Sequence, residues 1–122
     1  MHITTHTQNG HTICIVDGTD KIITDTGSAL SLAMDLQYQH NCNRIAIDKS
    51  LICEDFFILS TGLAGEILQK FTNYHIKMAI YGDYSRYTSK PLKDFIYESN
   101  KGNQFFFVET KELALEKLAN AK

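Results

Sequence analysis

Three short apolar segments, separated by stretches with helical spacing, constrain the fold of this chain most strongly. They are residues 44–48 (RIAID), 75–81 (HIKMAIY) and 104–109 (QFFFVE). Each is too apolar to form a strand with one face in water, and strands buried on both faces are typical of parallel sheets covered by helices. The sequence therefore predicts an α/β fold in which these segments are buried strands, with the three phenylalanines of the last one in the core.

The stretches between these segments have the periodicity of amphipathic helices. In residues 62–74, Ala64, Ile67, Leu68 and Phe71 fall on one face and polar residues on the other. Three further helices are expected on similar grounds: one after Gly27 and Ser28 that ends near His40, one from the N-cap Ser89 to Lys101, and one from the N-cap Thr110 to about Ala119.

The N-terminal segment has a different pattern. Residues 2–7 and 11–16 are rich in β-branched residues, and Asn9-Gly10 between them favours a type I′ turn, because both turn positions need positive φ. The expected order is β-β-α-β-α-β-α-β-α, in which an antiparallel hairpin precedes a mostly parallel sheet flanked by helices. With 122 residues, the chain has the size of one domain, and we expect residues 1–122 to form it.

The charge balance excludes several classes of partner. Twelve basic residues stand against fourteen acidic ones, with no run of like charge. Nucleic acids and anionic membranes require a strong basic surface, so we expect neither as a partner. No apolar stretch is long enough to span a membrane, and the N-terminus lacks the pattern of a secretory signal.

Cysteine spacing indicates a reducing compartment. Cys14, Cys42 and Cys53 form no C-x-x-C pair, which favours a cytoplasmic protein with free thiols. Neither the cysteines nor the histidines have the spacing of a metal site, and the Walker A and G-x-G-x-x-G motifs are absent. We therefore expect neither a metal nor a cofactor.

The carboxyl ends of the strands are where chemistry is expected, because ligands of open α/β sheets bind there. These ends supply Asp48 and, further along, Asp83 and Tyr84. The two aspartates are candidates for acid–base work or Mg²⁺ binding, or alternatively only cap the loops that follow. Residues 82–90, with Tyr84 and Arg86, form either a contact surface for a partner or a solvated loop.

The residues LSTG, at positions 59–62, precede a helix. The free amides and the positive end of the helix dipole favour a phosphate there, either on a ligand or on the hydroxyl group of Ser60 or Thr61. The alternative is that the hydroxyl groups only cap the helix. Ser60, Thr61 and Gly62 are thus candidates for phosphorylation or for anion binding.

The stretch LSTGLAGEIL, residues 59–68, is similar to the signature of STAS domains, which are named for sulphate transporters and anti-sigma-factor antagonists. Their motif reads D-S-S-G-L at the same strand–loop–helix junction, and their element order matches the one expected here. The resemblance places Thr61 at the position that is phosphorylated in the antagonists. Leu59 stands where that family has its aspartate.

A longer part of the chain, from about Phe56 to Val108, resembles the bacterial family called domain of unknown function 4180. The matching strings are FFILSTGLAGEILQKFTNY, MAIYGDYS and SKPLKDFIYESNKGNQFFFV. This resemblance implies a small bacterial cytoplasmic domain and assigns no activity.

Two functions from different classes follow. The first is a non-enzymatic regulatory domain that binds a protein partner and is switched by phosphate on Thr61. The second is a ligand-binding domain or small enzyme, in which the amides of Thr61 and Gly62 hold an anionic group while Asp48, Asp83 or Tyr84 contacts the rest. A homodimer is compatible with either.

Overall fold

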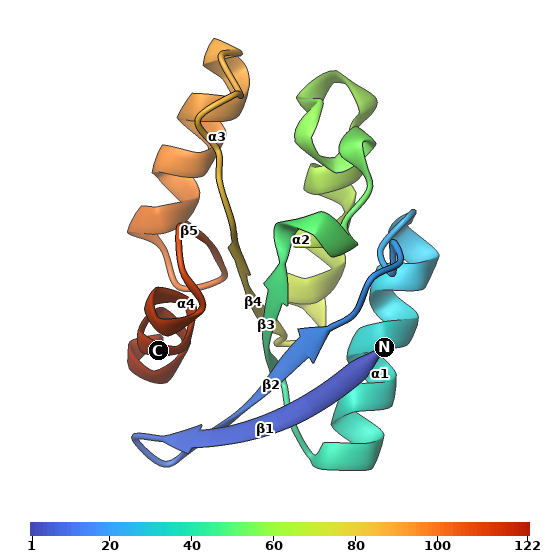
Figure 1. The fold of residues 1–122 in the computed structure, drawn as a ribbon, viewed down its shortest axis with the longest axis vertical. Helices are drawn as coiled ribbons and strands as arrows, with labels where there is room; N and C mark the ends of the chain where they lie inside the picture. The colour runs from blue at the N-terminus through green and yellow to red at the C-terminus, as the bar shows by residue number, and fades with distance from the viewer.

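A computed structural model describes all 122 residues and contains one five-stranded sheet. The strands follow one another across the sheet in chain order, β1-β2-β3-β4-β5, and four helices cover its two faces (Figure 1). The expected α/β class, with its mixed, mostly parallel sheet, is confirmed. The strands are β1 (His2–Gln8), β2 (His11–Asp17), β3 (Arg44–Asp48), β4 (Lys77–Tyr81) and β5 (Phe105–Val108).

The N-terminal hairpin forms as the sequence predicts. Asn9 and Gly10 both have positive φ, at 54° and 78°, as a type I′ turn requires. The ladder between β1 and β2 is antiparallel and unbroken from the pair His2 and Asp17 to the pair Gln8 and His11. All remaining strand pairs are parallel.

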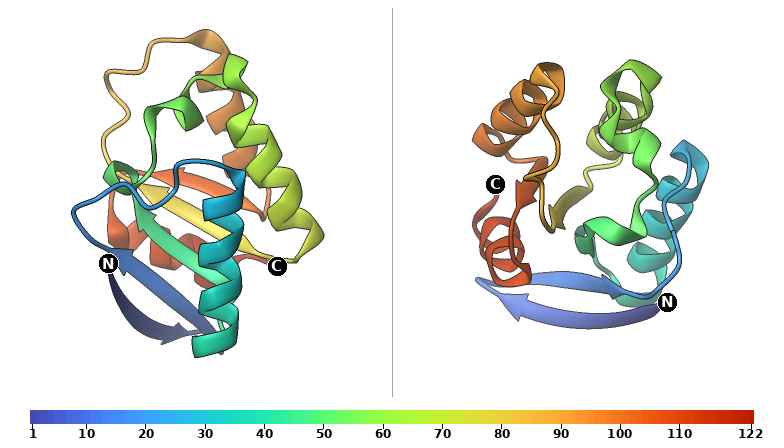
Figure 2. Two further views of the ribbon diagram at one scale, coloured as in Figure 1. Left: turned by 90° about the vertical axis from the view of Figure 1, so that its right-hand side faces the viewer. Right: turned by 45° about the horizontal axis from the view of Figure 1, so that its top comes forward.

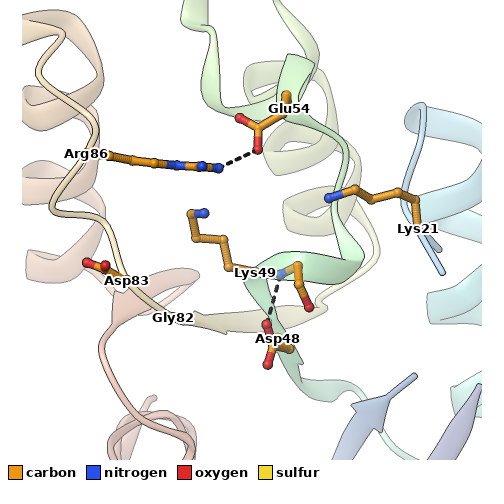
Figure 3. Close-up of a pocket in the computed structure, with 8 residues that line it drawn as sticks. Lys21, Asp48, Lys49, Glu54, Gly82, Asp83 and Arg86 are labelled. Carbon is orange, nitrogen blue, oxygen red and sulfur yellow. Dashed lines mark hydrogen bonds and ion pairs between the residues drawn. The ribbon is translucent and has the colours of Figure 1, made fainter. Parts of the chain in front are cut away.

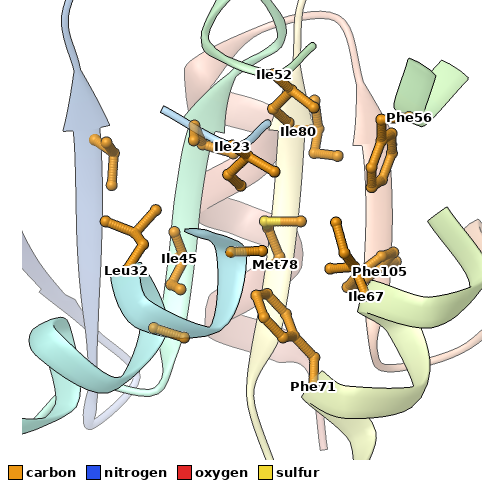
Figure 4. Packing of buried hydrophobic residues seen from close by; sticks show 14 of the residues in the cluster. Ile23, Leu32, Ile45, Ile52, Phe56, Ile67, Phe71, Met78, Ile80 and Phe105 are labelled. Atoms are coloured by element: carbon orange, nitrogen blue, oxygen red, sulfur yellow. The ribbon is translucent and has the colours of Figure 1, made fainter. Parts of the chain in front are cut away.

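The two faces of the sheet are covered unequally. Helices α1 (Thr26–His40), α2 (Leu63–Asn73) and α3 (Lys90–Lys101) lie on one face, over a cluster of 23 buried hydrophobic residues (Figures 1, 2 and 4). The other face is covered by α4 (Lys111–Asn120) over a smaller cluster of ten residues. The three phenylalanines of β5 divide between the clusters and are all buried, as expected.

Side-chain caps explain where the helices begin. The hydroxyl oxygens of Ser89 and Thr110 accept hydrogen bonds from the third amide of the helix that follows, at 3.4 and 3.2 Å, so both predicted N-caps are confirmed. Helix α1 instead begins after Asp25, which forms a capping box with Ser28. The sequence analysis missed this cap.

The segment between β3 and α2, expected to be a loop, folds back onto the sheet. It consists of three short 3₁₀ turns, Lys49–Leu51, Glu54–Phe57 and Leu59–Thr61. Phe56 and Phe57 are both buried, and the ring of Phe56 packs against those of Phe105 and Phe107 in β5. This segment is therefore part of the core, and it fixes the position of the polar side chains beside it.

Arg44 is a buried charged residue, on the face covered by α4. Its guanidinium donates hydrogen bonds to the carbonyl oxygens of Leu118 and Ala121 at the end of that helix. Burial lowers the pKa of Arg44 from its ordinary value. The side chain thus holds the C-terminal helix on the sheet and is not available to a ligand.

Candidate functional site

An open pocket of about 370 Å³ lies at the carboxyl edge of β3 and β4 (Figure 3). This is where ligands of α/β sheets are expected to bind. No hydrophobic residue lines it. Its walls are Lys21, Asp48, Lys49, Ser50, Glu54, Gly82, Asp83 and Arg86.

Strand pairing brings the two halves of the pocket together. Asp48 ends β3 and lies opposite Tyr81, the last residue of the neighbouring β4. The next residues along each strand, Lys49 and Gly82, therefore meet. A Cβ atom at Gly82 would lie 2.8 Å from the Cβ atom of Lys49. Only glycine at this position therefore leaves space for the Lys49 side chain.

Lys21 enters the pocket from a different part of the chain. Ile23 forms a parallel bridge with Ile52, and the amide of Ile22 donates to the carbonyl of Leu51 at 2.7 Å. This contact sets the segment before α1 beside the first 3₁₀ turn. The ammonium of Lys21 then lies 3.2 Å from the carbonyl oxygen of Ile52.

Lys49 carries a cation that forms no direct ion pair, although its charge helps to lower the pKa of the Asp83 carboxyl. Its Nζ lies over the rings of Tyr87 and Phe57, 4.7 and 5.4 Å from their centroids, and it forms no ion pair. In Figure 3 its side chain extends toward the space between Arg86 and Glu54. The aromatic rings stabilise the ammonium while leaving it able to pair with an anion.

Arg86 and Glu54 form the one ion pair of the pocket, with 2.9 Å between the guanidinium nitrogen and the carboxylate oxygen. The second carboxylate oxygen of Glu54 accepts a hydrogen bond from the Tyr87 hydroxyl at 3.1 Å. Glu54 is therefore engaged at both oxygens. Arg86 retains N–H donors that this pair does not use.

Asp48 and Asp83 both shape the turns that follow their strands. One oxygen of Asp48 accepts from the amide of Ser50 at 2.9 Å, and one of Asp83 accepts from the amide of Ser85 at 2.8 Å. The hydrogen bond from Ser85 is the main reason that the pKa of Asp83 is lowered. These are the loop caps that the sequence left as an alternative, and each aspartate keeps a second oxygen for other partners.

Tyr84 does not face this pocket, contrary to the expectation that it contacts a ligand there. Its ring lies beside those of Phe57 and Phe107, and its hydroxyl donates to the carbonyl of Ile80 at 2.7 Å. Burial is the main cause that raises the pKa of this hydroxyl far above its ordinary value. Tyr84 is half-buried, packs against the core under the loop, and lines a different, mostly apolar cavity beside α3.

At the entry to α2, Thr61 and the amides before the helix are bonded within the chain. The Thr61 hydroxyl donates to the carbonyl oxygens of Asp55 and Ile58, at 2.7 and 2.9 Å, and accepts from the amide of Leu63 at 3.3 Å. The amides of Thr61 and Gly62 donate to the carbonyls of Ile58 and Leu59, both at 3.0 Å. These two amides are thus not free to hold an anion, and that part of the ligand-binding expectation is wrong.

Ser60 lies apart from Asp48 and Asp83, in a second cavity of about 400 Å³. This groove, which we call the Ser60 groove, runs between the 3₁₀ turns and the loop before α3. Arg86 lines both cavities. The Ser60 groove is lined by Phe57, Ile58, Leu59, Ser60, Arg86, Tyr87, Thr88, Ser89, Pro91 and Leu92.

The structure thus unites three of the predicted site residues, Asp48, Asp83 and Arg86, in one pocket. Sequence reasoning missed Lys21 and Glu54. Lys21 reaches the pocket because Ile23 pairs with Ile52 beyond the end of β3, and no pattern in the sequence marked that pairing. No sequence pattern marked Glu54, because the 3₁₀ turns that place it read as a loop.

The pocket carries charges of both signs and no hydrophobic wall. Three cationic side chains, Lys21, Lys49 and Arg86, and three carboxylates surround the space, and Arg86 with Glu54 is the one ion pair among them. No three His, Cys, Asp or Glu side chains of the chain lie close enough together to hold one metal ion. None of its helices combines the length and apolarity needed to cross a membrane.

The fold and the pocket define a small α/β domain with a polar site at the carboxyl edge of a mixed sheet. The chain belongs to the family described as a domain of unknown function (DUF4180), whose profile matches residues 8–118. Searches of curated proteins and of solved structures gave no match.

Proposed function

We propose that this chain binds a small, polar, anionic molecule in the pocket at the carboxyl edge of β3 and β4. The observation that carries the proposal is the unpaired ammonium of Lys49 in a pocket that has no hydrophobic wall. A phosphate or carboxylate group there pairs with Lys49, Lys21 and the free donors of Arg86. The free oxygens of Asp48 and Asp83 accept hydrogen bonds from hydroxyl or amino groups of the same molecule.

The lining also restricts the rest of the ligand. Bases and other aromatic groups bind on apolar or aromatic walls, and this pocket offers none. We therefore expect phosphorylated polyols or small hydroxy acids to bind more tightly than nucleotides or aromatic acids.

Thermal unfolding with defined probes tests this function. Glycerol phosphate, inorganic phosphate and malate serve as probes, with benzoate as the aromatic comparison. A ligand at about a hundred times its Kd stabilises the fold by about 2.7 kcal/mol, which raises Tm by several degrees. If no anionic probe changes Tm, the proposal fails.

Two lysine variants show whether such a shift comes from the pocket. Lys49→Met removes the ammonium and keeps an apolar side chain over the aromatic rings, so the ligand-induced shift should disappear. Lys70→Gln removes the same charge from an exposed position of α2, outside the pocket, and should leave the shift intact. Equal shifts in both variants would mean that the anion binds elsewhere.

A second candidate function is a regulatory protein-interaction domain with STAS-like use of Ser60 and Thr61. The Ser60 groove supports it, because Ile58 beside the groove is 50% exposed and the Ser60 hydroxyl makes no hydrogen bond. Phosphate on Ser60 would place about two negative charges at a groove that Arg86 also lines. Phosphate on Thr61 would instead break the hydrogen bonds that its hydroxyl donates.

Intact-mass and phosphopeptide analysis of the protein from its native host tests this switch. Pulldowns with the wild type, Ser60→Glu and Thr61→Glu then test partner binding. The interaction proposal requires a partner whose recovery changes in one variant; identical background proteins in all three samples would remove it.

We also propose that the protein works in the bacterial cytoplasm, as the resemblance to its family implies. Its three cysteines support a reducing compartment, because all are free thiols and two of them, Cys14 and Cys42, are buried. Fractionation of the native host checks this location.

A further inference from the structure

The outer edge of β1 is open along the whole strand. β1 has seven residues and pairs with β2 on one side only, as the last strand of the sheet. Figures 1 and 2 show no helix or loop beyond it. An open edge presents unpaired backbone N–H and C=O groups to any other strand.

The opposite edge of the sheet is protected. β5 has four residues and lies between α3 and α4. The side chain of Asn100, in α3, donates to the carbonyl of Phe107 at 3.1 Å and accepts from its amide at 2.8 Å. This single amide group occupies the backbone positions where a further strand would pair.

β1 has none of the features that usually protect an edge. Its sequence, HITTHTQ, contains no lysine or proline, and its ladder with β2 has no bulge. Two contacts also hold the hairpin in place. Ile3 packs on the core, and the side-chain amide of Asn9 donates to the side-chain oxygen of Asn120 at 2.8 Å. The edge is thus preorganised for pairing.

The register shows which groups point outward. Gln8 and His11 close a two-residue turn, so they form a hydrogen-bonded pair, and such pairs alternate along an antiparallel ladder. The even-numbered residues of β1 therefore bond to β2. Ile3, Thr5 and Thr7 direct their N–H and C=O groups outward.

We propose that β1 pairs in antiparallel fashion with β1 of a second copy of this chain. The two-fold axis passes at Thr5, which places Ile3 of one copy opposite Thr7 of the other. This register joins all outward groups of both strands in about six backbone hydrogen bonds. It also pairs Thr5 with Thr5 of the second copy, and such threonine pairs stabilise sheets.

Charge favours a second copy as the occupant. β1 contains no Asp, Glu, Lys or Arg, so two copies meet without repulsion between like charges. Its outward groups are symmetric about Thr5, and an antiparallel strand of the same sequence therefore satisfies every one of them. The resulting structure is one continuous sheet across both copies.

The experiment combines sedimentation velocity with amide hydrogen exchange on the full chain. The proposal predicts a dimer whose population rises with concentration. It also predicts that exchange at Ile3, Thr5 and Thr7 slows as the dimer forms, while Thr4 and His6 are protected at every concentration. A chain that stays monomeric at its highest soluble concentration overturns the proposal, as does a dimer in which Ile3, Thr5 and Thr7 still exchange freely.

Variants at Thr5 provide the matched pair. Thr5→Pro removes the outward N–H of Thr5 and no hydrogen bond to β2, so the hairpin remains while the dimer Kd rises at least about tenfold. Thr5→Val keeps the backbone donor and should still dimerise. Unchanged dimerisation in a folded Thr5→Pro overturns the proposal, and if that variant does not fold, the exchange pattern of the wild type decides. Recovery of a foreign strand on β1 in place of a second copy also overturns it.

Discussion

Two regions, the carboxyl edge of the sheet and the entry to α2, were expected to share one anionic ligand. They differ in whether their polar groups are already hydrogen-bonded or paired within the chain. At the carboxyl edge of the sheet, Lys49 has no acid partner, and Asp48 and Asp83 each use one oxygen and leave the other free. At the entry to α2, the hydroxyl of Thr61 and the amides of Thr61 and Gly62 are all bonded within the chain. The first region leaves polar groups unpaired, and the second uses the Thr61 hydroxyl and the Thr61 and Gly62 amides in its own turn.

The difference indicates that a polar sequence motif offers donors to a ligand only where the chain leaves those donors unused. Ser and Thr side chains compete for nearby backbone groups, and Thr61 does so at two carbonyls. The Lys49 ammonium is not bonded to a backbone carbonyl in this way, because its neighbours are the rings of Phe57 and Tyr87. Variants in each region test whether this contrast holds.

The largest effect is expected from Gly82→Ala, in the pocket. A Cβ atom there would clash with Lys49 at 2.8 Å, and the backbone at φ 154° disfavours any side chain. We expect the free energy of unfolding to fall by about 2–3 kcal/mol and Lys49 to lose its position over the rings. Urea unfolding measures the first change, and weaker anion binding reports the second.

Gly65→Ala is the matched control for this substitution. Its added Cβ atom meets nothing within 4 Å, and it lies inside α2. Alanine is the better helix former, so this variant should gain about 0.5–1 kcal/mol. If Gly82→Ala were as stable as Gly65→Ala, the close approach of Lys49 would not constrain the pocket.

A smaller loss is expected from Thr61→Val, at the entry to α2. The valine has nearly the same shape and removes the hydroxyl that links Asp55, Ile58 and Leu63. We expect a loss of about 1–2 kcal/mol in urea unfolding. Anion binding at the carboxyl edge should be unchanged, and Thr61→Ser should retain most of the stability. A loss of anion binding in Thr61→Val would show that Thr61 contributes to the anion site, and would contradict the contrast between the two regions.

Most of the fold was predictable because its signals are local. The turn at Asn9 and Gly10 has one compatible geometry, and the caps Ser89 and Thr110 stand directly before their helices. The missed cap, Asp25, depends on reciprocal hydrogen bonds with Ser28, and the Gly27-Ser28 pair that follows placed the expected helix start too late in the chain. Local pattern and steric restriction were sufficient for these elements.

The candidate site was predictable only in part, because it depends on contacts between distant segments. Asp48 and Asp83 follow from the rule for strand ends, and the structure places both in the pocket. Lys21 reaches it through the bridge between Ile23 and Ile52, and Glu54 through a 3₁₀ turn. Neither contact has a periodic signal in the sequence, so pairing of this kind requires the structure.

Gly62→Ala should have a smaller effect than the loss of the Thr61 hydroxyl. Gly62 has φ of 81°, which costs an alanine about 1 kcal/mol, but a Cβ atom there meets no other atom within 4 Å. We therefore expect a drop of that size in urea unfolding. Gly62→Asn should lose less, because asparagine tolerates this conformation. A drop as large as that of Gly82→Ala would show that the α2 entry is as constrained as the pocket.

The smallest effect concerns the pH dependence of stability, which should arise in the pocket and not at the α2 entry. The pKa of Asp83 is lowered in the folded chain, mainly by the amide of Ser85, so the folded state binds the proton less readily than the unfolded state. This contribution to stability is present above the ordinary aspartate pKa of about 4 and is lost as the pH falls through the lower folded value. Asp83→Asn keeps an oxygen for Ser85 and removes the charge. Urea unfolding between about pH 5 and pH 3 should therefore show a shallower loss for Asp83→Asn than for the wild type. Thr61→Ser, which changes no titratable group, should follow the wild type, and a shallower loss in that variant as well would contradict the contrast between the two regions.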